Sequence, residues 1–320
     1  MADYTQLKIN KKNRSIAIIK ENAIYLVTIG IFILFAIFLR DKGFLTSVNI
    51  MNIFRQTAMI SIMSVGFTFV LACGEFDLSV GSVVALGAVI GGLALQRFGI
   101  VASVTIALAA GIFIGFINGI LVLKVKMPAF LATLATAGVI SGFTRWISKL
   151  QGIAITNDRF SFIFGGGNLG RISTLFIWTI VIVIIGQLIL ANTSFGRKVL
   201  ATGGNKVAAT FSGINVSNVK LVIFMAMGVL AALVGLLYSG RLNAARYSYG
   251  ENDLFTVVAA VVIGGNSIYG GKGTVVGALI GSIILGMINN GLILFGLNTD
   301  MQIMLRGLII LIAVALSPKE

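Results

Sequence analysis

Histidine is absent from this chain of 320 residues, cysteine occurs once and proline only twice. Without histidine, the chain has no imidazole for a metal site, a proton relay or a Ser-His-Asp triad. The lone Cys73 lies in an apolar run, which favours an inert buried thiol, and it excludes a disulfide within the chain. We therefore expect no catalytic residues, no metal site and no cofactor.

Charged residues are also scarce, at 11% of the chain, whereas hydrophobic residues make up 58% and the mean hydropathy is +1.03. A soluble fold would have to cover far more apolar surface than so few charges allow. The net charge of +14 could suggest nucleic acid, but the basic residues are scattered between apolar runs. Contact with anionic lipid headgroups explains them better, so we expect a lipid bilayer around the chain and no nucleic-acid partner.

Apolar segments of roughly the length of a bilayer span recur about ten times. They lie near residues 23–39, 57–73, 80–95, 99–123, 130–147, 173–191, 218–238, 254–265, 274–296 and 301–316. This pattern predicts an all-α polytopic membrane protein of about ten transmembrane helices. We expect a basic cytoplasmic tail over residues 1–22 and one transmembrane domain over residues 23–320. With the tail inside, an even number of spans also places the loop around Arg197 in the cytoplasm.

Two segments look like broken helices. The eighth is short enough to be a half-helix and ends in the glycine-rich loop GGNSIYGGKG, Gly264 to Gly273. Membranes tolerate such a break only where protein or a water-filled cavity shields its backbone. The other break is GEFDLSVGS, which sets Glu75 and Asp77 between two apolar runs. A charge at bilayer depth costs at least about 2.5 kcal/mol unless it faces protein or water, so this break predicts a pathway or a hinge.

Asp77 stands directly before the third apolar segment. We expect its carboxylate to accept hydrogen bonds from the backbone N–H groups of Leu78 and Ser79 and so to cap the helix that restarts there. A different class of function remains open, because two acids two residues apart could relay a proton. The rival prediction is therefore a proton-coupled carrier or channel that uses Glu75 and Asp77.

The chain also contains an apparent internal repeat. Residues Val80–Gly92 followed by Gly115–Val122 resemble Gly273–Ser282 followed by Gly286–Leu294. Two related halves, each with a broken segment, are common in transporters, although the uniform composition makes chance similarity an alternative. Glycines four residues apart, at 87 and 91, 111, 115 and 119, and 277 and 281, predict tightly packed helices.

Asparagines in the apolar segments need a partner, which can be a neighbouring helix or a sugar hydroxyl. With the polar residues of the first break, they complete a set of residues for the substrate pathway or gate. The set is Glu75, Asp77, Ser79, Asn118, Asn289 and Asn290.

The loop after the sixth segment, at about residues 195–217, is polar and basic. Its Gly203-Gly204-Asn205 turn precedes a short helical stretch, Lys206 to Ser212, which Gly213 can end as a left-handed C-cap. A short cytoplasmic helix between spans is a lever that a soluble partner could grip. An ordinary basic loop is the alternative.

Together these motifs resemble the integral membrane permeases of bacterial sugar ABC importers of the ribose, xylose and galactoside type. The resemblance rests on GEFDLSVGS, ATGGNKVAATFSGINV, AAVVIGGNSIYGGKGTVVGALIGSIILGMINNGL and LIILIAVALS, and covers nearly the whole chain from about the second span. It implies a multi-pass protein of the bacterial plasma (inner) membrane. It also implies three protein partners: a cytoplasmic ABC ATPase, an extracytoplasmic sugar-binding protein and a second permease subunit, usually identical.

The resemblance further implies that the region from Ala208-Ala209 to Gly213 forms the helix that docks on the ATPase. The predicted coupling residues are Arg197, Gly204, Asn205, Ala208, Ala209 and Gly213. The chain has no GxxxxGK[ST] loop, so we expect a separate subunit to hydrolyse ATP and this chain to be no enzyme.

The chain departs from the family pattern at three positions. Leu254 and Thr256 stand where ribose-type relatives tend to carry acids, and Val207 stands where the coupling motif is often acidic. These departures leave ribose itself open. The nearer alternative is an ABC permease for amino acids or nucleosides, because the fold alone does not fix the substrate.

Overall fold

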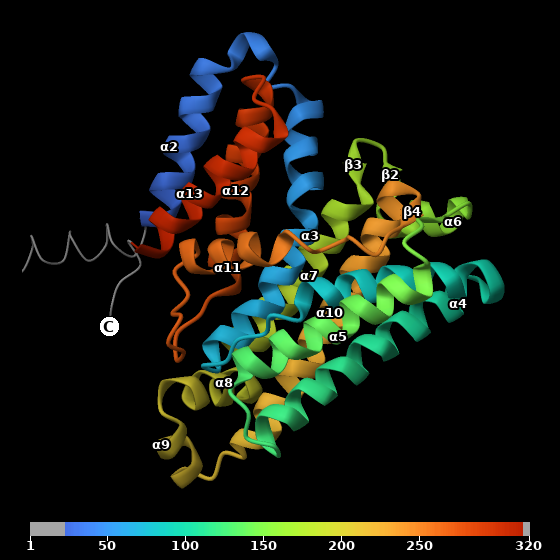
Figure 1. The fold of residues 1–320 in the computed structure, drawn as a ribbon. Helices are drawn as coiled ribbons and strands as arrows, with labels where there is room; N and C mark the ends of the chain where they lie inside the picture. Colours follow the sequence, from blue (N-terminus) through green and yellow to red (C-terminus); the bar gives the residue numbers. More distant parts are fainter. Residues whose placement is uncertain (1–22, 316–320) are drawn as a thin grey trace, which may run out of the picture.

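The computed structural model describes residues 23–315, which form a bundle of helices with two very small sheets (Figure 1). The long helices are α2 (Ala23–Phe38), α3 (Ser47–Ala72), α4 (Val80–Leu123), α5 (Ala129–Ser148), α7 (Thr174–Asn192), α10 (Val216–Leu242), α12 (Val275–Leu294) and α13 (Thr299–Ala315). The shorter ones are α6 (Asp158–Ser161), α8 (Ser194–Gly204), α9 (Lys206–Phe211) and α11 (Asp253–Ile263), with single turns at Arg40–Lys42 and Phe162–Gly166. Antiparallel strand pairs join β1 (Ile153–Ala154) to β4 (Ala244–Ala245) and β2 (Asn168–Leu169) to β3 (Ile172–Ser173). The predicted all-α polytopic fold is confirmed.

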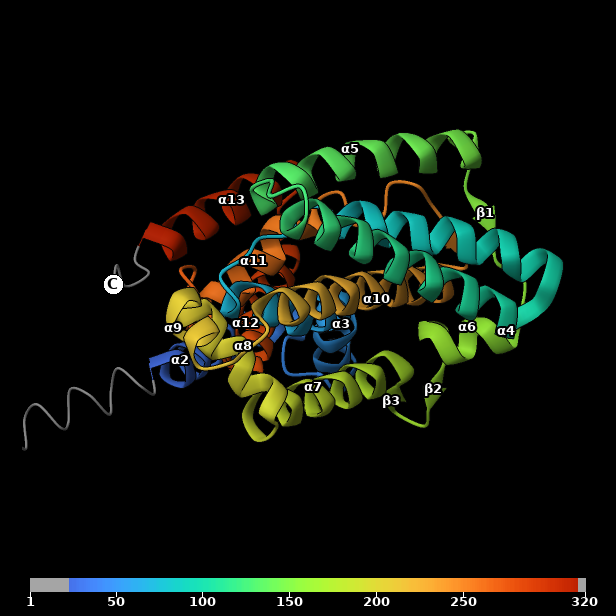
Figure 2. The same ribbon diagram turned by 90° about the horizontal axis from the view of Figure 1, so that it is seen from below.

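Within residues 23–315, six helices are long and apolar enough to cross a membrane: α3, α4, α5, α7, α10 and α12. The longest, α4, has 44 residues and contains a kink at Gly99, whose φ of +81° suits glycine alone among common residues. Its two arms lie side by side in Figure 2, and the Ser103 hydroxyl donates across them to the Gly91 carbonyl oxygen at 2.8 Å. The kink therefore separates two of the predicted spans. With α2, α11 and α13, each of the ten predicted apolar segments contains a helix.

The core forms where α10 packs along both arms of α4 (Figure 2). A Cβ atom on Gly111 or Gly115 would collide with the carbonyl oxygen of Gly228 or Phe224 on α10. Such small residues let helix backbones approach closely where lipid provides no hydrophobic drive between helices. The prediction that these glycines pack helices together is confirmed. The same holds for Gly277 and Gly281 of α12, which lie against the backbone of Gly264 and Ala260 at the end of α11.

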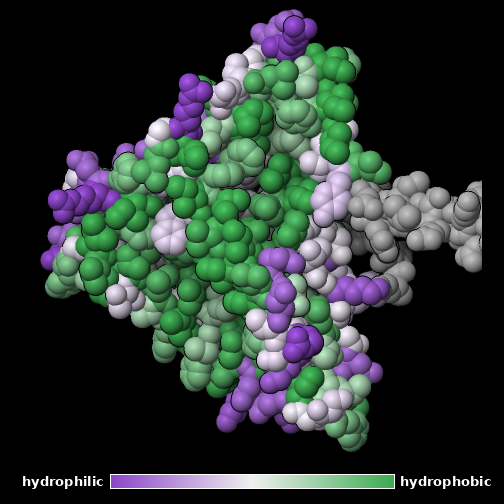
Figure 3. Space-filling view, turned by 180° about the vertical axis from the view of Figure 1, so that it is seen from behind, coloured by the Kyte–Doolittle hydropathy of each residue, from purple (hydrophilic) through white to green (hydrophobic). Residues whose placement is uncertain are grey.

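The surface of the molecule separates into an apolar middle and polar ends. Figure 3 shows hydrophobic residues spread across the middle of this face, with hydrophilic residues gathered toward its edges. One end contains the loop of residues 73–79, α8, α9 and the loop of residues 264–274; following the predicted orientation, we call it the inner end. The opposite, outer end contains α6, the strand pair β1–β4 and the loop of residues 246–252.

Both predicted broken segments are present, at residues 73–79 and 264–274, and α11 is a half-helix of 11 residues. The two halves of the proposed repeat have different structures. Val80–Gly92 and Gly115–Val122 lie on separate arms of α4, whereas Gly286–Leu294 and most of Gly273–Ser282 lie on one helix, α12. The internal repeat stays a prediction, and the predicted tail of residues 1–22 lies outside the described residues.

Candidate functional site

The break after α3 is joined to α10 by a buried ion pair. Gly74 turns the chain out of α3 with a φ of +75°, and the Glu75 carboxylate then pairs with the Lys220 ammonium group. The side chains of Glu75 and Lys220 are only 14% and 10% exposed. Buried charges need such partners, because a single unpaired charge in this environment is strongly destabilising. Glu75 therefore anchors the break to the first turns of α10.

Asp77 bonds Ser79, the residue directly before the helix that restarts at Val80, and makes no bond to the first turn of that helix, so the predicted cap is wrong. Its Oδ1 atom accepts hydrogen bonds from the Ser79 backbone N–H at 2.8 Å and from the Ser79 hydroxyl at 2.6 Å. The predicted bond to Ser79 is confirmed, but the one to Leu78 is wrong. The Leu78 N–H instead donates to the Thr133 hydroxyl on α5 at 3.0 Å, because α5 packs against the break.

The bond between Asp77 and Ser79 is part of a larger buried network. The Asn118 amide donates to the Ser79 hydroxyl at 2.8 Å, and the Thr136 hydroxyl donates to the Asn118 amide oxygen at 2.7 Å. Asp77, Ser79 and Asn118 are all almost fully buried. The network connects the break to the second arm of α4 and to α5. Three of the predicted pathway residues are therefore brought together, in packed protein rather than in an open passage.

The two asparagines of α12 have different surroundings. Asn290 and Asn49 exchange two hydrogen bonds, at 3.0 and 2.9 Å, which tie α12 to α3. Asn289 lines a cavity of about 120 Å³ in the outer half of the bundle. The structure thus separates the predicted pathway residues into the network at the break, the helix-to-helix pair of Asn290, and the cavity.

At the inner end, α8 touches both broken segments. A Cβ atom on Gly203 would collide with the Ala72 carbonyl oxygen and lie 2.8 Å from the Gly271 nitrogen. The Gly271 N–H in turn donates to the Ala72 carbonyl oxygen at 2.9 Å. The end of α3, the glycine-rich loop and α8 therefore meet backbone to backbone, so a shift of α8 must move both breaks.

The short helix α9 follows the predicted turn. The Asn205 side chain accepts a hydrogen bond from the Ala208 N–H at 2.9 Å, as expected of an N-cap. Ala209 is the buried residue of α9. Gly213 has a φ of +80° and ends the turn. Its added Cβ would meet open space, and the Arg197 side chain on α8 is exposed. Gly204 lies close to Gly271 of the glycine-rich loop.

Two apolar side chains project from α9 into the open. Val207 is 64% exposed and Phe211 is 89% exposed, and at a spacing of four residues they share one face of the helix. Val207 and Phe211 are therefore the apolar side chains that α9 offers to a partner. The sequence singles out Val207 only by its missing charge, and the exposure of Phe211 was not predicted.

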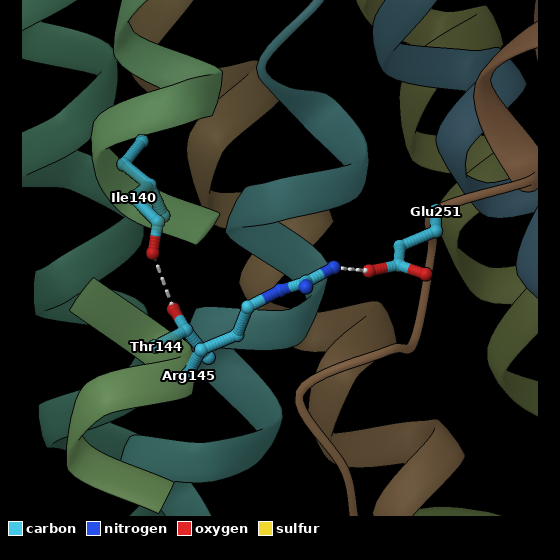
Figure 4. A network of polar contacts seen from close by, with 4 residues as sticks. All are labelled: Ile140, Thr144, Arg145 and Glu251. Carbon is cyan, nitrogen blue, oxygen red and sulfur yellow. Dashed lines mark hydrogen bonds and ion pairs between the residues drawn. The ribbon is translucent and has the colours of Figure 1, made fainter. Parts of the chain in front are cut away.

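At the outer end, an ion pair links α5 to the loop before α11 (Figure 4). The Arg145 guanidinium donates to Glu251 Oε1 at 2.7 Å and also lies 5.6 Å from the centre of the Tyr247 ring. Thr144, the neighbour of Arg145, bonds only within α5, to the Ile140 carbonyl oxygen at 2.7 Å. Both partners of the pair are nearly half exposed, so it contributes at most about 1 kcal/mol and can open readily. We call Arg145 and Glu251 the outer clasp.

Tyr249 connects this loop to the cavity. Burial raises the pKa of the Tyr249 phenol, which stays neutral and donates to the Ala244 carbonyl oxygen at 2.9 Å. Its ring stacks on Tyr238 of α10 with 5.1 Å between ring centres. Among residues 23–315, no three His, Cys, Asp or Glu side chains gather as metal ligands would.

Comparison with known proteins gives consistent matches. The family model described as "Branched-chain amino acid transport system / permease component" matches residues 49–314. The ribose import permease protein of Bacillus subtilis is 39% identical, covering 91% of this chain and 92% of the relative. The galactose/methyl galactoside import permease protein of Haemophilus influenzae is 34% identical, with 96% of each chain covered. The xylose transport system permease protein of the same organism is 33% identical, with 91% and 95% covered. No solved structure matches the chain.

Proposed function

Because the chain belongs to the family of permease components of the branched-chain amino acid transport system type, we propose that it is the membrane-spanning subunit of an ATP-dependent sugar importer. We propose a monosaccharide as the substrate because the relatives are named for ribose, galactoside and xylose import. Each of these relatives is matched over most of its length. The chain would be a multi-pass protein of the bacterial plasma membrane. Its role is transport, and ATP hydrolysis belongs to another subunit.

The contact between α8 and the two breaks supports a lever at the inner end. An ATPase subunit that grips α9 through Val207 and Phe211 would push α8 against the backbone of Ala72 and Gly271. Because small residues leave no side chains between these backbones, displacement would pass directly into α3 and the half-helix α11. The coupling residues Arg197, Gly204, Asn205, Ala208, Ala209 and Gly213 belong to this lever.

The outer end would receive sugar from an extracytoplasmic binding protein. The outer clasp lies on the exposed loop that leads into α11, where a docking protein could compete for Arg145 or Glu251. Two copies of this chain would enclose the pathway, because symmetric dimers of identical subunits are the commonest oligomers. The gate residues Glu75, Asp77, Ser79 and Asn118 would hold the break rigid while the helices rock.

A proton-coupled carrier is less well supported. Glu75 has a lysine partner and Asp77 is held by Ser79, so the two carboxylates have separate partners. Glu75 and Lys220 line an open cavity of about 770 Å³ at the inner end, whereas Asp77 is buried, so the two acids do not share one water-filled path. The alternative with a specific observation behind it is an amino acid permease, because the family description names branched-chain amino acids.

The test is an uptake assay with the complete importer. The permease is co-expressed with its ATPase and binding protein, reconstituted into vesicles and supplied with ATP. Radiolabelled D-ribose, D-xylose and D-galactose are compared with L-leucine. Uptake of at least one sugar but not of leucine is the expected result. Uptake of leucine alone would replace the sugar with the amino acid alternative.

A further inference from the structure

The cavity in the outer half of the bundle has polar walls contributed by four helices. Its polar lining comprises Gln56, Thr57, Tyr238, Asp253, Thr256, Ser282 and Asn289, from α3, α10, α11 and α12. Ile60 and Leu285 add apolar surface. Four elements far apart in sequence thus place polar groups around one space, which is unusual for an apolar bundle.

Two polar atoms in this wall are buried and have no hydrogen-bond partner among residues 23–315. They are the amide oxygen of Gln56 and the hydroxyl oxygen of Thr256, and Thr256 is only 8% exposed. Buried polar groups are normally satisfied, so each exception needs an explanation. A small ligand or water in the cavity would supply the missing partners.

The chemistry of the wall selects the kind of ligand. An amide oxygen accepts hydrogen bonds, and a threonine hydroxyl both donates and accepts, which suits the hydroxyl groups of a sugar. The Tyr238 hydroxyl donates to Asp253 Oδ2 at 2.7 Å, which keeps the single carboxylate oriented. None of the described residues that line the cavity is lysine or arginine. A phosphate or carboxylate would therefore meet a like charge and no cation.

The size of the cavity limits the ligand further. At about 120 Å³ it has room for about four waters at ~30 Å³ each. Pockets for drug-sized ligands are about 300–1,000 Å³. A nucleoside or disaccharide exceeds this space, whereas one ring with several hydroxyl groups approaches it.

The half-helix α11 connects the cavity to the inner end. Its first turns carry Asp253 and Thr256, and at ~1.5 Å per residue its 11 residues span about 16 Å. The loop that follows α11 contains Gly271, which bonds Ala72 beside Gly203 of α8. On the other side, Asp253 stands two residues after Glu251 of the outer clasp. A ligand in the cavity would thus contact the element that joins both ends.

We propose that this cavity is a transient binding site for a single neutral sugar ring within one permease subunit, with Thr256 and Gln56 as its hydrogen-bonding groups. The proposal rests on the proposed function and adds where the sugar is bound on its way. Direct contact between sugar and Thr256 also makes this residue a determinant of which monosaccharide passes.

The test uses the complete importer in vesicles with radiolabelled D-ribose, D-xylose and D-galactose. The Thr256→Val substitution removes the hydroxyl at nearly constant shape, whereas Thr256→Ser retains it. The matched control is Thr179→Val on α7, because the Thr179 hydroxyl is also buried but bonds the Leu175 carbonyl oxygen of its own helix and lies outside the cavity.

We expect Thr256→Val to lower the sugar carried per ATP by about fivefold and to alter the order of preference among the sugars. Thr256→Ser and the Thr179→Val control should both retain the wild-type order. A merely structural role of Thr256 would lower all three sugars equally. Wild-type uptake and wild-type preference in Thr256→Val would overturn the proposal while leaving the proposed function intact.

A second measurement does not depend on transport by a weakened variant. In a Cys73→Ala background, Thr256→Cys is the only thiol of the permease chain, and the rate at which N-ethylmaleimide labels this chain is measured with and without each sugar. The transported sugar should slow labelling, and an unchanged rate would overturn the proposal. If the wild-type importer carries none of the three sugars, the proposed function fails, and this site falls with it.

Discussion

At the scale of single residues, two substitutions of Asp77 can separate the loss of its charge from the loss of its hydrogen-bond acceptor. Asp77→Asn keeps an oxygen that can accept from Ser79, so substantial ATP-driven uptake should remain. Asp77→Leu removes this acceptor and leaves buried donors unpaired, which should cost about 1–3 kcal/mol of stability and most of the uptake. Uptake normalised to membrane-inserted protein compares the two variants. Equal loss in both would contradict a role for Asp77 as the acceptor of the Ser79 hydrogen bonds.

The Glu75 and Lys220 pair offers a double-mutant cycle. Glu75→Gln or Lys220→Met alone leaves one buried charge without its partner and should destabilise the protein by about 3–5 kcal/mol. The double variant removes both charges, so its thermal stability and uptake should return toward the wild type. If Glu75 relayed protons, the double variant would stay inactive however stable it became.

These residues also show how much the sequence could predict. The bond from the Ser79 N–H to Asp77 was predictable because the two residues are only two positions apart in the chain. The partners Lys220 and Glu251 were not, because each lies more than a hundred residues from the acid or base that it meets. The unpartnered atoms of Gln56 and Thr256 could be recognised only once four helices had been assembled around them.

At the scale of elements, the lever α8–α9 and the outer clasp are the parts expected to move. The clasp should hold the loop before α11 in place until the binding protein arrives. Reversing one charge, with Arg145→Glu or Glu251→Arg, sets like charges against each other. We expect ATP hydrolysis in the absence of binding protein to rise a few fold, and the double reversal to restore the wild-type rate. An unchanged rate in both single variants would show that the clasp does not restrain the loop.

For the lever, Gly213→Glu should prevent co-purification of the ATPase while the permease stays in the membrane. Within this chain the space around Gly213 is open, so any steric conflict must come from a partner. The left-handed backbone at Gly213 adds strain of about 1–2 kcal/mol for ordinary side chains, but asparagine tolerates it. Gly213→Asn is therefore the matched control and should retain the ATPase. Normal assembly of Gly213→Glu would place the contact elsewhere.

The elements themselves were predictable from hydropathy, because a span in lipid must be apolar over its whole length. The prediction was weakest where elements meet. The half-helix α11 was indicated by the glycine-rich loop that follows it, but the kink at Gly99 was not predicted, and the meeting of Ala72, Gly203 and Gly271 involves backbone atoms that carry no sequence signal.

At the scale of the whole molecule, we propose that the permease is a passive gate, which the ATPase moves through α8 and α9 at the inner end. The clasp, the cavity, α11, the glycine-rich loop and α8 form one continuous path through a single subunit. In the proposed mechanism, energy would enter by the lever, and the sugar would be held only by a few hydrogen bonds, which would allow quick release. The charges buried at the first break stabilise its geometry rather than supply energy.

The source of that energy is the central claim, and one measurement tests it most directly. Sugar uptake is followed in vesicles that contain the permease with its ATPase and binding protein, at constant ATP, before and after a protonophore collapses the proton gradient. The account predicts that uptake requires ATP and continues unchanged without the gradient. Uptake that stops with the protonophore while ATP is still present would contradict it and favour a proton-coupled carrier.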